Sequence, residues 1–217
     1  MKHLLTLFLS ISLTAANAQL KSVSISADKM NVLYVGIDNP VTIAVAGINS
    51  NDIDVSVIGL DGVSISGENA RYIVRASQQT GYNQFCSVPV KDKKSGQIYG
   101  SFPLRVKRIP DPQARLSGRT DGNISAGEMK VQNGIMAVLE NFDFEAKCQI
   151  SSYELMYIAN VGDPVVSINA GAAFSPQTKK LIEAAQSGDV YIFKVVKGRC
   201  PGDVAGRMLN PLVFTIK

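Results

Sequence analysis

The segment FPLRVKRIPDP, residues 102–112, divides the chain into two parts. Its first half alternates apolar with polar or basic residues, as a strand with one buried face does. Pro110 and Pro112 then fix their own φ angles, lack backbone N–H donors and push the preceding residues out of the helical region. The segment therefore predicts a last strand that runs into a short, stiff domain boundary. An ordinary loop inside one domain is the alternative interpretation.

The start of the chain has the features of a secretory signal peptide. A short basic start, MKH, precedes an apolar run over residues 4–13, and the small residues Ala16 and Ala18 precede a predicted cleavage between Ala18 and Gln19. The run is too short to span a bilayer, and no later segment is long enough. The residue directly after the predicted cleavage point is Gln19 and not cysteine, so the product is not expected to be a lipoprotein. We expect an exported, periplasmic protein without an integral membrane segment.

Residues 19–108 predict an immunoglobulin-like β-sandwich of about seven strands. Short runs of alternating apolar residues recur between segments rich in Asp, Asn, Gly and Pro, which favour turns. Val41, Ile43 and Val45 illustrate the period of two, because all three fall on one face. The expected strands cover residues 22–26, 32–35, 41–45, 53–58, 71–76, 85–90 and 97–106.

Residues 109–217 predict an antiparallel α+β domain, rich in β-structure, with one clear helix. Ser175 is a good N-cap and Pro176 suits the first helical position, and Gly188 ends the run. Ser125 and Glu128 have the spacing of a capping box, which predicts one further helical turn. Together with the first domain, this makes the protein mainly β.

The stretch ENFDFEAKCQI, residues 140–150, predicts an antiparallel strand. Its apolar residues fall on one face and its polar residues on the other. Beyond Ser151 and Ser152 the apolar positions change parity, which predicts a bulge. The same alternation places Asp143 and Glu145 on one strand face, with Lys147 beside them.

Three cysteines remain in an exported chain, where disulfides are permitted. Cys86 precedes the predicted boundary, whereas Cys148 and Cys200 follow it. A disulfide inside one domain would therefore join Cys148 to Cys200. Buried free thiols are the alternative, because cysteine also packs well without a bridge.

The composition excludes several kinds of chemistry. The only histidine, His3, leaves with the signal peptide, so the mature chain has neither a histidine-based catalytic triad nor imidazole metal ligands. No nucleotide-binding glycine motif is present. Removing residues 1–18 leaves 21 basic and 18 acidic residues, a net charge of +3 that is too small to indicate nucleic acid. We expect no enzyme activity, cofactor or metal; for Asp143 and Glu145, a solvated charge ladder is favoured over a glycosidase-type pair.

Several stretches together resemble one family. They are KMNVLYVGIDNPV at residues 29–41, RVKRIPDP at 105–112, ENFDF at 140–144, and an ending that contains GDVYIF at 188–193, PG at 201–202 and RML at 207–209. The chain resembles the C-terminal periplasmic region of the gliding-motility and type IX secretion protein GldM, also called PorM. This resemblance implies a third-periplasmic-type module at residues 19–108 and a C-terminal module at residues 109–217. In that family the modules form the distal part of a long, dimeric periplasmic arm.

The resemblance implies a non-enzymatic protein-interaction module, with partners among the envelope proteins of a secretion and motility complex and a homodimer as one option. The family's N-terminal transmembrane helix and helical periplasmic domain are replaced here by the predicted signal peptide. Asp38, Asn39, Arg108 and Asp111 are candidates for a partner surface, although turn formation and core packing also explain them. An exported β-sandwich that binds glycans or other cell-surface ligands is the alternative function, and a hydrolase that uses carboxylates alone is a third.

Overall fold

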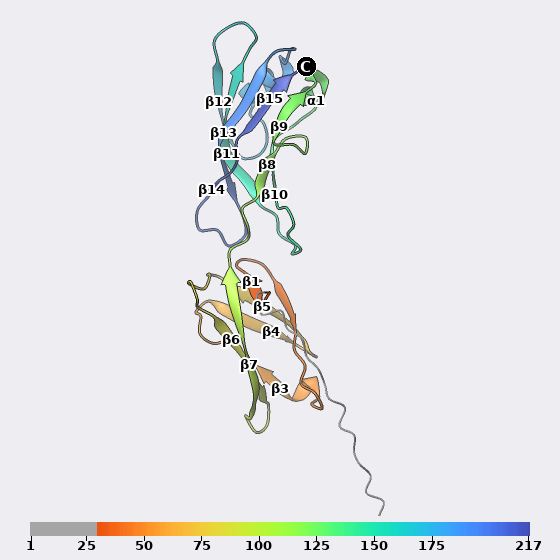
Figure 1. Ribbon diagram of the computed structural model, residues 1–217, viewed down its shortest axis with the longest axis vertical. Coiled ribbons are helices and arrows are strands. Elements are labelled where there is room, and N and C mark those ends of the chain that lie inside the picture. Colours follow the sequence, from red (N-terminus) through yellow and green to blue (C-terminus); the bar gives the residue numbers. More distant parts are fainter. Residues whose placement is uncertain (1–29) are drawn as a thin grey trace, which may run out of the picture.

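The computed structural model describes residues 30–217 and consists of two β-rich modules placed end to end (Figure 1). The long strand β7 (Ile98–Lys107) leads out of the first module, and the chain crosses once into the second. The predicted signal peptide, the cleavage between Ala18 and Gln19 and the strand expected at residues 22–26 lie outside the described residues. No helix within residues 30–217 is long and apolar enough to cross a membrane.

The first module is a sandwich of two sheets. One sheet has the order β1-β7-β6-β3, in which β1 is parallel to β7 and the other neighbours are antiparallel; the second has the order β2-β5-β4. Apolar side chains from both sheets form its core, including Leu33, Val74, Cys86 and Val106. The remaining strands are β1 (Val32–Tyr34), β2 (Asn39–Thr42), β3 (Ile53–Val55), β4 (Val63–Glu68), β5 (Arg71–Ala76) and β6 (Cys86–Asp92).

Strand β4 has no counterpart among the strands expected from the sequence. The segment has a short strand pattern, because Val63 and Ile65 alternate with serines, but Asp61-Gly62 before it and Gly67-Glu68 at its end favour turns. It forms a strand because β5 pairs with it over its full length, from Val63 opposite Ala76 to Glu68 opposite Arg71. The pairing with β5, added to this short alternation, gives the segment its extended conformation.

The second module contains a six-stranded sheet with the order β12-β11-β13-β15-β9, and β14 pairs with β13 off this path. A small antiparallel pair, β8 and β10, and two helices complete it. The elements are β8 (Gln113–Arg115), β9 (Asp121–Ile124), α1 (Ala126–Lys130), β10 (Met136–Val138), β11 (Gln149–Ile158), β12 (Val165–Ala170), α2 (Pro176–Glu183), β13 (Val190–Arg199), β14 (Arg207–Met208) and β15 (Leu212–Ile216).

Local signals for both helices are confirmed. The Ser125 hydroxyl accepts a hydrogen bond from the Glu128 N–H, and the Ser175 hydroxyl accepts one from the Thr178 N–H, so each serine satisfies a free donor of the first turn. The bulge is confirmed as well, because the register of β11 against β13 shifts on both sides of Ser152. The mainly β architecture is therefore the one that the sequence predicts.

The strand predicted over residues 140–150 is wrong for most of its length. Residues 140–148 are irregular, and β11 begins only at Gln149. The apolar alternation has a different cause. Phe142 and Phe144 project from an unpaired segment and contact Tyr34 of the first module, with ring centroids 4.8 and 5.1 Å from that of Tyr34.

Candidate functional site

The six-stranded sheet of the second module has one covered face and one open face. Tyr153, Leu155, Tyr191 and Phe193 point to the covered side and are buried in a core that also takes in Ile182 of α2. Ser167 and Asn169 of β12 point to the same side and hydrogen-bond Thr178 of α2. Because neighbours along a strand face opposite ways, the residues between them lie on the open face.

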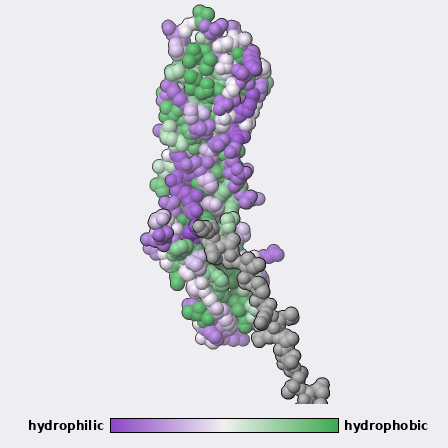
Figure 2. All heavy atoms as spheres, in the orientation of Figure 1, coloured by the Kyte–Doolittle hydropathy of each residue, from purple (hydrophilic) through white to green (hydrophobic). Residues whose placement is uncertain are grey.

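An apolar row crosses this open face. Val166, Met156, Ile192 and Val213 are successive partners on β12, β11, β13 and β15. Val166 and Val213 are exposed, and Ile168 on β12 has 75% of its surface exposed. Figure 2 shows hydrophobic residues gathered on this module over the region of β12 and β13. We call Met156, Val166, Ile168, Ile192 and Val213 the open-face patch.

Two further features suit the open-face patch to a protein partner. Its flank carries the Glu154–Lys194 ion pair at 3.5 Å, which supplies a polar rim. Within the described residues, β12 pairs only with β11, so its other edge presents unpaired backbone groups. A contiguous apolar surface beside a free edge is typical of a protein interface.

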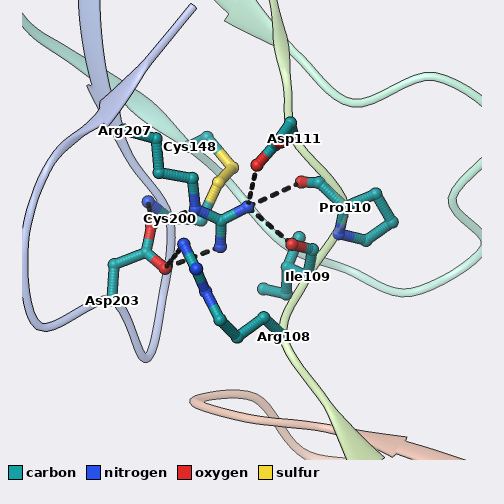
Figure 3. The surroundings of a disulfide bond; sticks show 8 residues. All are labelled: Arg108, Ile109, Pro110, Asp111, Cys148, Cys200, Asp203 and Arg207. Atoms are coloured by element: carbon teal, nitrogen blue, oxygen red, sulfur yellow. Dashed lines mark hydrogen bonds and ion pairs between the residues drawn. A yellow bond between two sulfur atoms is a disulfide. The ribbon is translucent and has the colours of Figure 1, made fainter.

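The junction between the modules is built around a buried ion pair, Asp203 with Arg207 (Figure 3). The guanidinium donates to both carboxylate oxygens, at 2.8 Å and 2.6 Å, and the side chains are only 1% and 7% exposed. Burial alone would raise the pKa of Asp203, but hydrogen bonds from Arg207 and from the Cys200 N–H outweigh it and hold this pKa below its ordinary value. The pair is therefore fully charged at neutral pH.

Arg207 also holds the boundary segment. Its Nη1 donates to the Ile109 carbonyl at 2.6 Å, to the Pro110 carbonyl at 3.1 Å and to the Asp111 carboxylate at 2.8 Å. Ile109 is buried, and Arg108 reaches Asp203 at 3.3 Å. A side chain of the second module thus anchors the segment that leaves the first (Figure 3).

Backbone and aromatic contacts also join the two modules. Gly36 lies so close to Gly202 that a Cβ on Gly36 would overlap the backbone nitrogen of Gly202. Tyr34 contacts the rings of Phe142 and Phe144, as described above. A cleft of about 610 Å³ opens beside these contacts, between residues 77–79 of the first module and residues 204–208 of the second.

A disulfide joins Cys148 and Cys200, 52 residues apart, and Cys86 is a free, buried thiol. Of the two states that the sequence left open, the structure therefore has the bridged one. Its two cysteines flank paired strands, since Gln149 lies opposite Arg199. The bridge connects the segment that carries Phe142 and Phe144 to the loop that carries Gly202 and Asp203.

The four residues expected at a partner surface do not form one group. Asp38 is exposed and pairs with Arg75 at 2.5 Å. Asn39 is 1% exposed and bonds the backbone of Tyr34, Ile37 and Val74, so its place in a partner surface is wrong; its amide fixes a turn instead. Arg108 and Asp111 belong to the junction.

Asp143 and Glu145 lie in the irregular segment, not on one face of a strand as predicted, and both are exposed. Among residues 30–217, no group of three or more acidic, cysteine or histidine side chains is arranged to hold a metal ion. Asp203 and Arg207 are not among the candidate site residues that the sequence suggests. Their spacing of four residues resembles a helical ion pair, but it falls in a segment with Pro201 and Gly202 that gives no helical pattern.

The fold and the junction define a class of protein: a two-module, β-rich arm in which an immunoglobulin-like sandwich is fixed to an α+β domain. Two models of known protein families match the chain. The family model of the GldM third domain matches residues 22–107, and that of the GldM C-terminal domain matches residues 110–217. The chain belongs to the GldM family and corresponds to its C-terminal region. A search of curated proteins returned no match.

Membership of this family indicates the general role of the chain. GldM proteins are structural components of the machinery for gliding motility and secretion, and their C-terminal domains are periplasmic. The resemblance stated from the sequence motifs is thereby confirmed.

Proposed function

We propose that this protein is an exported, non-enzymatic interaction arm of a gliding-motility and type IX secretion complex in the periplasm. The open-face patch of the second module is its docking surface, and the occupant is an envelope protein of that complex. The observation that carries this proposal is the apolar row across four strands, from Val166 to Val213, on a sheet face that no element of the described chain covers.

The chemistry of the patch defines the surface that it accepts. Aliphatic side chains supply non-directional attraction, worth roughly 25 cal/mol for each Å² that is removed from water. The free edge of β12 adds backbone donors and acceptors that an extended partner segment can pair with. The partner therefore presents an apolar strand or sheet edge, with polar groups placed to meet Glu154 and Lys194.

Affinity capture tests this function. Tagged mature protein is incubated with envelope extract, and the captured proteins are identified by mass spectrometry. We expect components of the motility and secretion complex to be enriched with the native protein and lost with Ile168→Asp, which places a charge in the patch. Val131→Asp is the matched control, because Val131 is also exposed in this module but follows α1, away from the open face.

Two outcomes would contradict the proposal. Equal capture by the native protein and Ile168→Asp would show that the patch is not the docking surface. If no component of the complex is captured, while the native protein binds purified surface glycans, the glycan-binding alternative is favoured.

A further inference from the structure

The Cys148–Cys200 disulfide lies at the junction rather than deep in a module. Cys148 immediately precedes β11, and Cys200 immediately follows β13. These strands are already paired up to Gln149 and Arg199, so the bridge extends an existing ladder by one residue. The sheet does not depend on the bridge to bring the two strands together.

Both cysteines lead directly into segments that contact the first module. Before Cys148, Phe142 and Phe144 contact Tyr34. After Cys200, Gly202 lies against Val35 and Gly36, and the Asp203 carboxylate takes hydrogen bonds from Arg108 and Arg207. The bridge is the covalent link between these two sets of contacts, and Figure 3 shows it beside Arg108, Asp203 and Arg207.

The segment that carries the phenylalanines has few other restraints. Between its ends, residues 141–147 make no hydrogen bond to any other residue within 30–217. Glu140 is held by Arg115 at one end, and Cys148 is held by the bridge at the other. The position of both rings against Tyr34 therefore depends on how firmly these ends are fixed.

We propose that the Cys148–Cys200 disulfide is a redox-sensitive lock on the angle between the two modules, and that a dithiol reductant releases it. Cys148 is half-buried, whereas Cys200 is 4% exposed, so an incoming thiolate attacks the sulfur of Cys148 and the Cys200 sulfur leaves. The second thiol of the reductant then attacks the mixed disulfide and frees Cys148. The reductant becomes a disulfide, having given two electrons and two protons, and both cysteines become thiols.

The lock rests on the proposed function and deepens it. An arm that presents a docking face needs a fixed direction only while a partner is bound to that face. In the oxidised state the two contact segments move as one unit. In the reduced state each module keeps its own core, since the two sets of buried residues do not overlap. What changes is the coupling between them.

Small-angle scattering and ring contacts measured by NMR test the lock on the mature protein. The oxidised protein, the same sample after dithiothreitol and the folded Cys148→Ser/Cys200→Ser variant are compared, and intact Cys86 is present in all three. We expect a single elongated shape with Tyr34–Phe142 ring contacts when oxidised. After reduction we expect a broadened distribution of maximum dimensions and loss of these contacts, with the amide spectra of both modules retained.

An unchanged distribution after reduction would overturn the proposal. Unfolding of the second module on reduction would overturn it too, because the ring contacts would then be lost with the fold and not through release of a lock. The result is independent of the capture experiment: a protein that captures no partner can still change shape on reduction, so failure of the docking function and failure of the lock are distinguishable.

Discussion

Arg207 and Asp203 form a buried, two-pronged ion pair at 2.6 and 2.8 Å, and the same guanidinium bonds the backbone of the boundary segment at Ile109 and Pro110. One side chain of the second module thereby fixes the direction in which the chain leaves the first. The prolines restrict the chain locally, and Arg207 fixes it relative to the second module. Stiffness at the boundary is thus a property of tertiary structure as well as of composition.

Removing Arg207 should destabilise the second module and the junction together. In Arg207→Met the Asp203 carboxylate stays buried without its main partner, and breaking a buried pair in this way costs about 3–5 kcal/mol. Chemical denaturation measures the loss in the free energy of unfolding. Arg108→Met is the matched control: Arg108 is 49% exposed and contacts the same carboxylate, so its loss should cost about 1 kcal/mol or less. Equal losses in the two variants would contradict this account.

Gly36→Ala tests the contact between the modules at the backbone. Gly36 has φ +80°, and the new Cβ would collide with backbone atoms of Pro201 and Gly202. Gly47→Ala is the control, because Gly47 has nearly the same φ of +76° but no atom within 4 Å of the place where its new methyl group would lie. Both variants incur the left-handed penalty of about 1–2 kcal/mol, and only Gly36→Ala should also shift the amide signals of residues 201–203. If both variants left those signals unchanged, the modules would not be in contact there.

The sequence predicts those parts of the structure that local rules determine. The caps at Ser125 and Ser175, the bulge near Ser152 and most strands of the first module follow from side-chain chemistry and periodicity. The alternation over residues 140–148 misleads, because a period of two describes a strand only when a partner strand is present. The ion pair of Asp203 and Arg207 could not be predicted from the sequence either, because it also depends on distant residues. Arg207 is held by the carbonyl groups of Ile109 and Pro110, almost a hundred residues away.

The disulfide should be found as Cys148–Cys200 in the folded protein, with Cys86 as the single free thiol. Peptide mapping without reduction measures the pairing, and alkylation of Cys86 should require unfolding because this thiol is buried. In the chain-entropy treatment, closing a loop of this length contributes roughly 4 kcal/mol to the free energy of unfolding. Three free thiols in the folded protein would contradict the prediction.

The junction should lose stability only in acid. Because the pKa of Asp203 is held below its ordinary value of 3.8, its contribution to stability is fully present above that pH and is lost as the pH falls through the lower pKa of the folded state. The carbon-13 carboxyl shift of Asp203 reports this titration, and we expect a midpoint below 3.8. A midpoint at or above 3.8 would mean that the hydrogen bonds from Arg207 and from the Cys200 N–H do not outweigh the burial of the carboxylate.

The central claim is that the two modules are held as one body, so that the first orients the docking face of the second. Residual dipolar couplings of the oxidised protein in a weakly aligning medium test this most directly, because they give a separate alignment tensor for each module. The account predicts tensors of equal magnitude and orientation when both are placed in the frame of the structure, since Arg207, Gly36 and the Tyr34 contacts join the modules. Two tensors that differ clearly in magnitude would show modules that reorient independently, and would contradict the account.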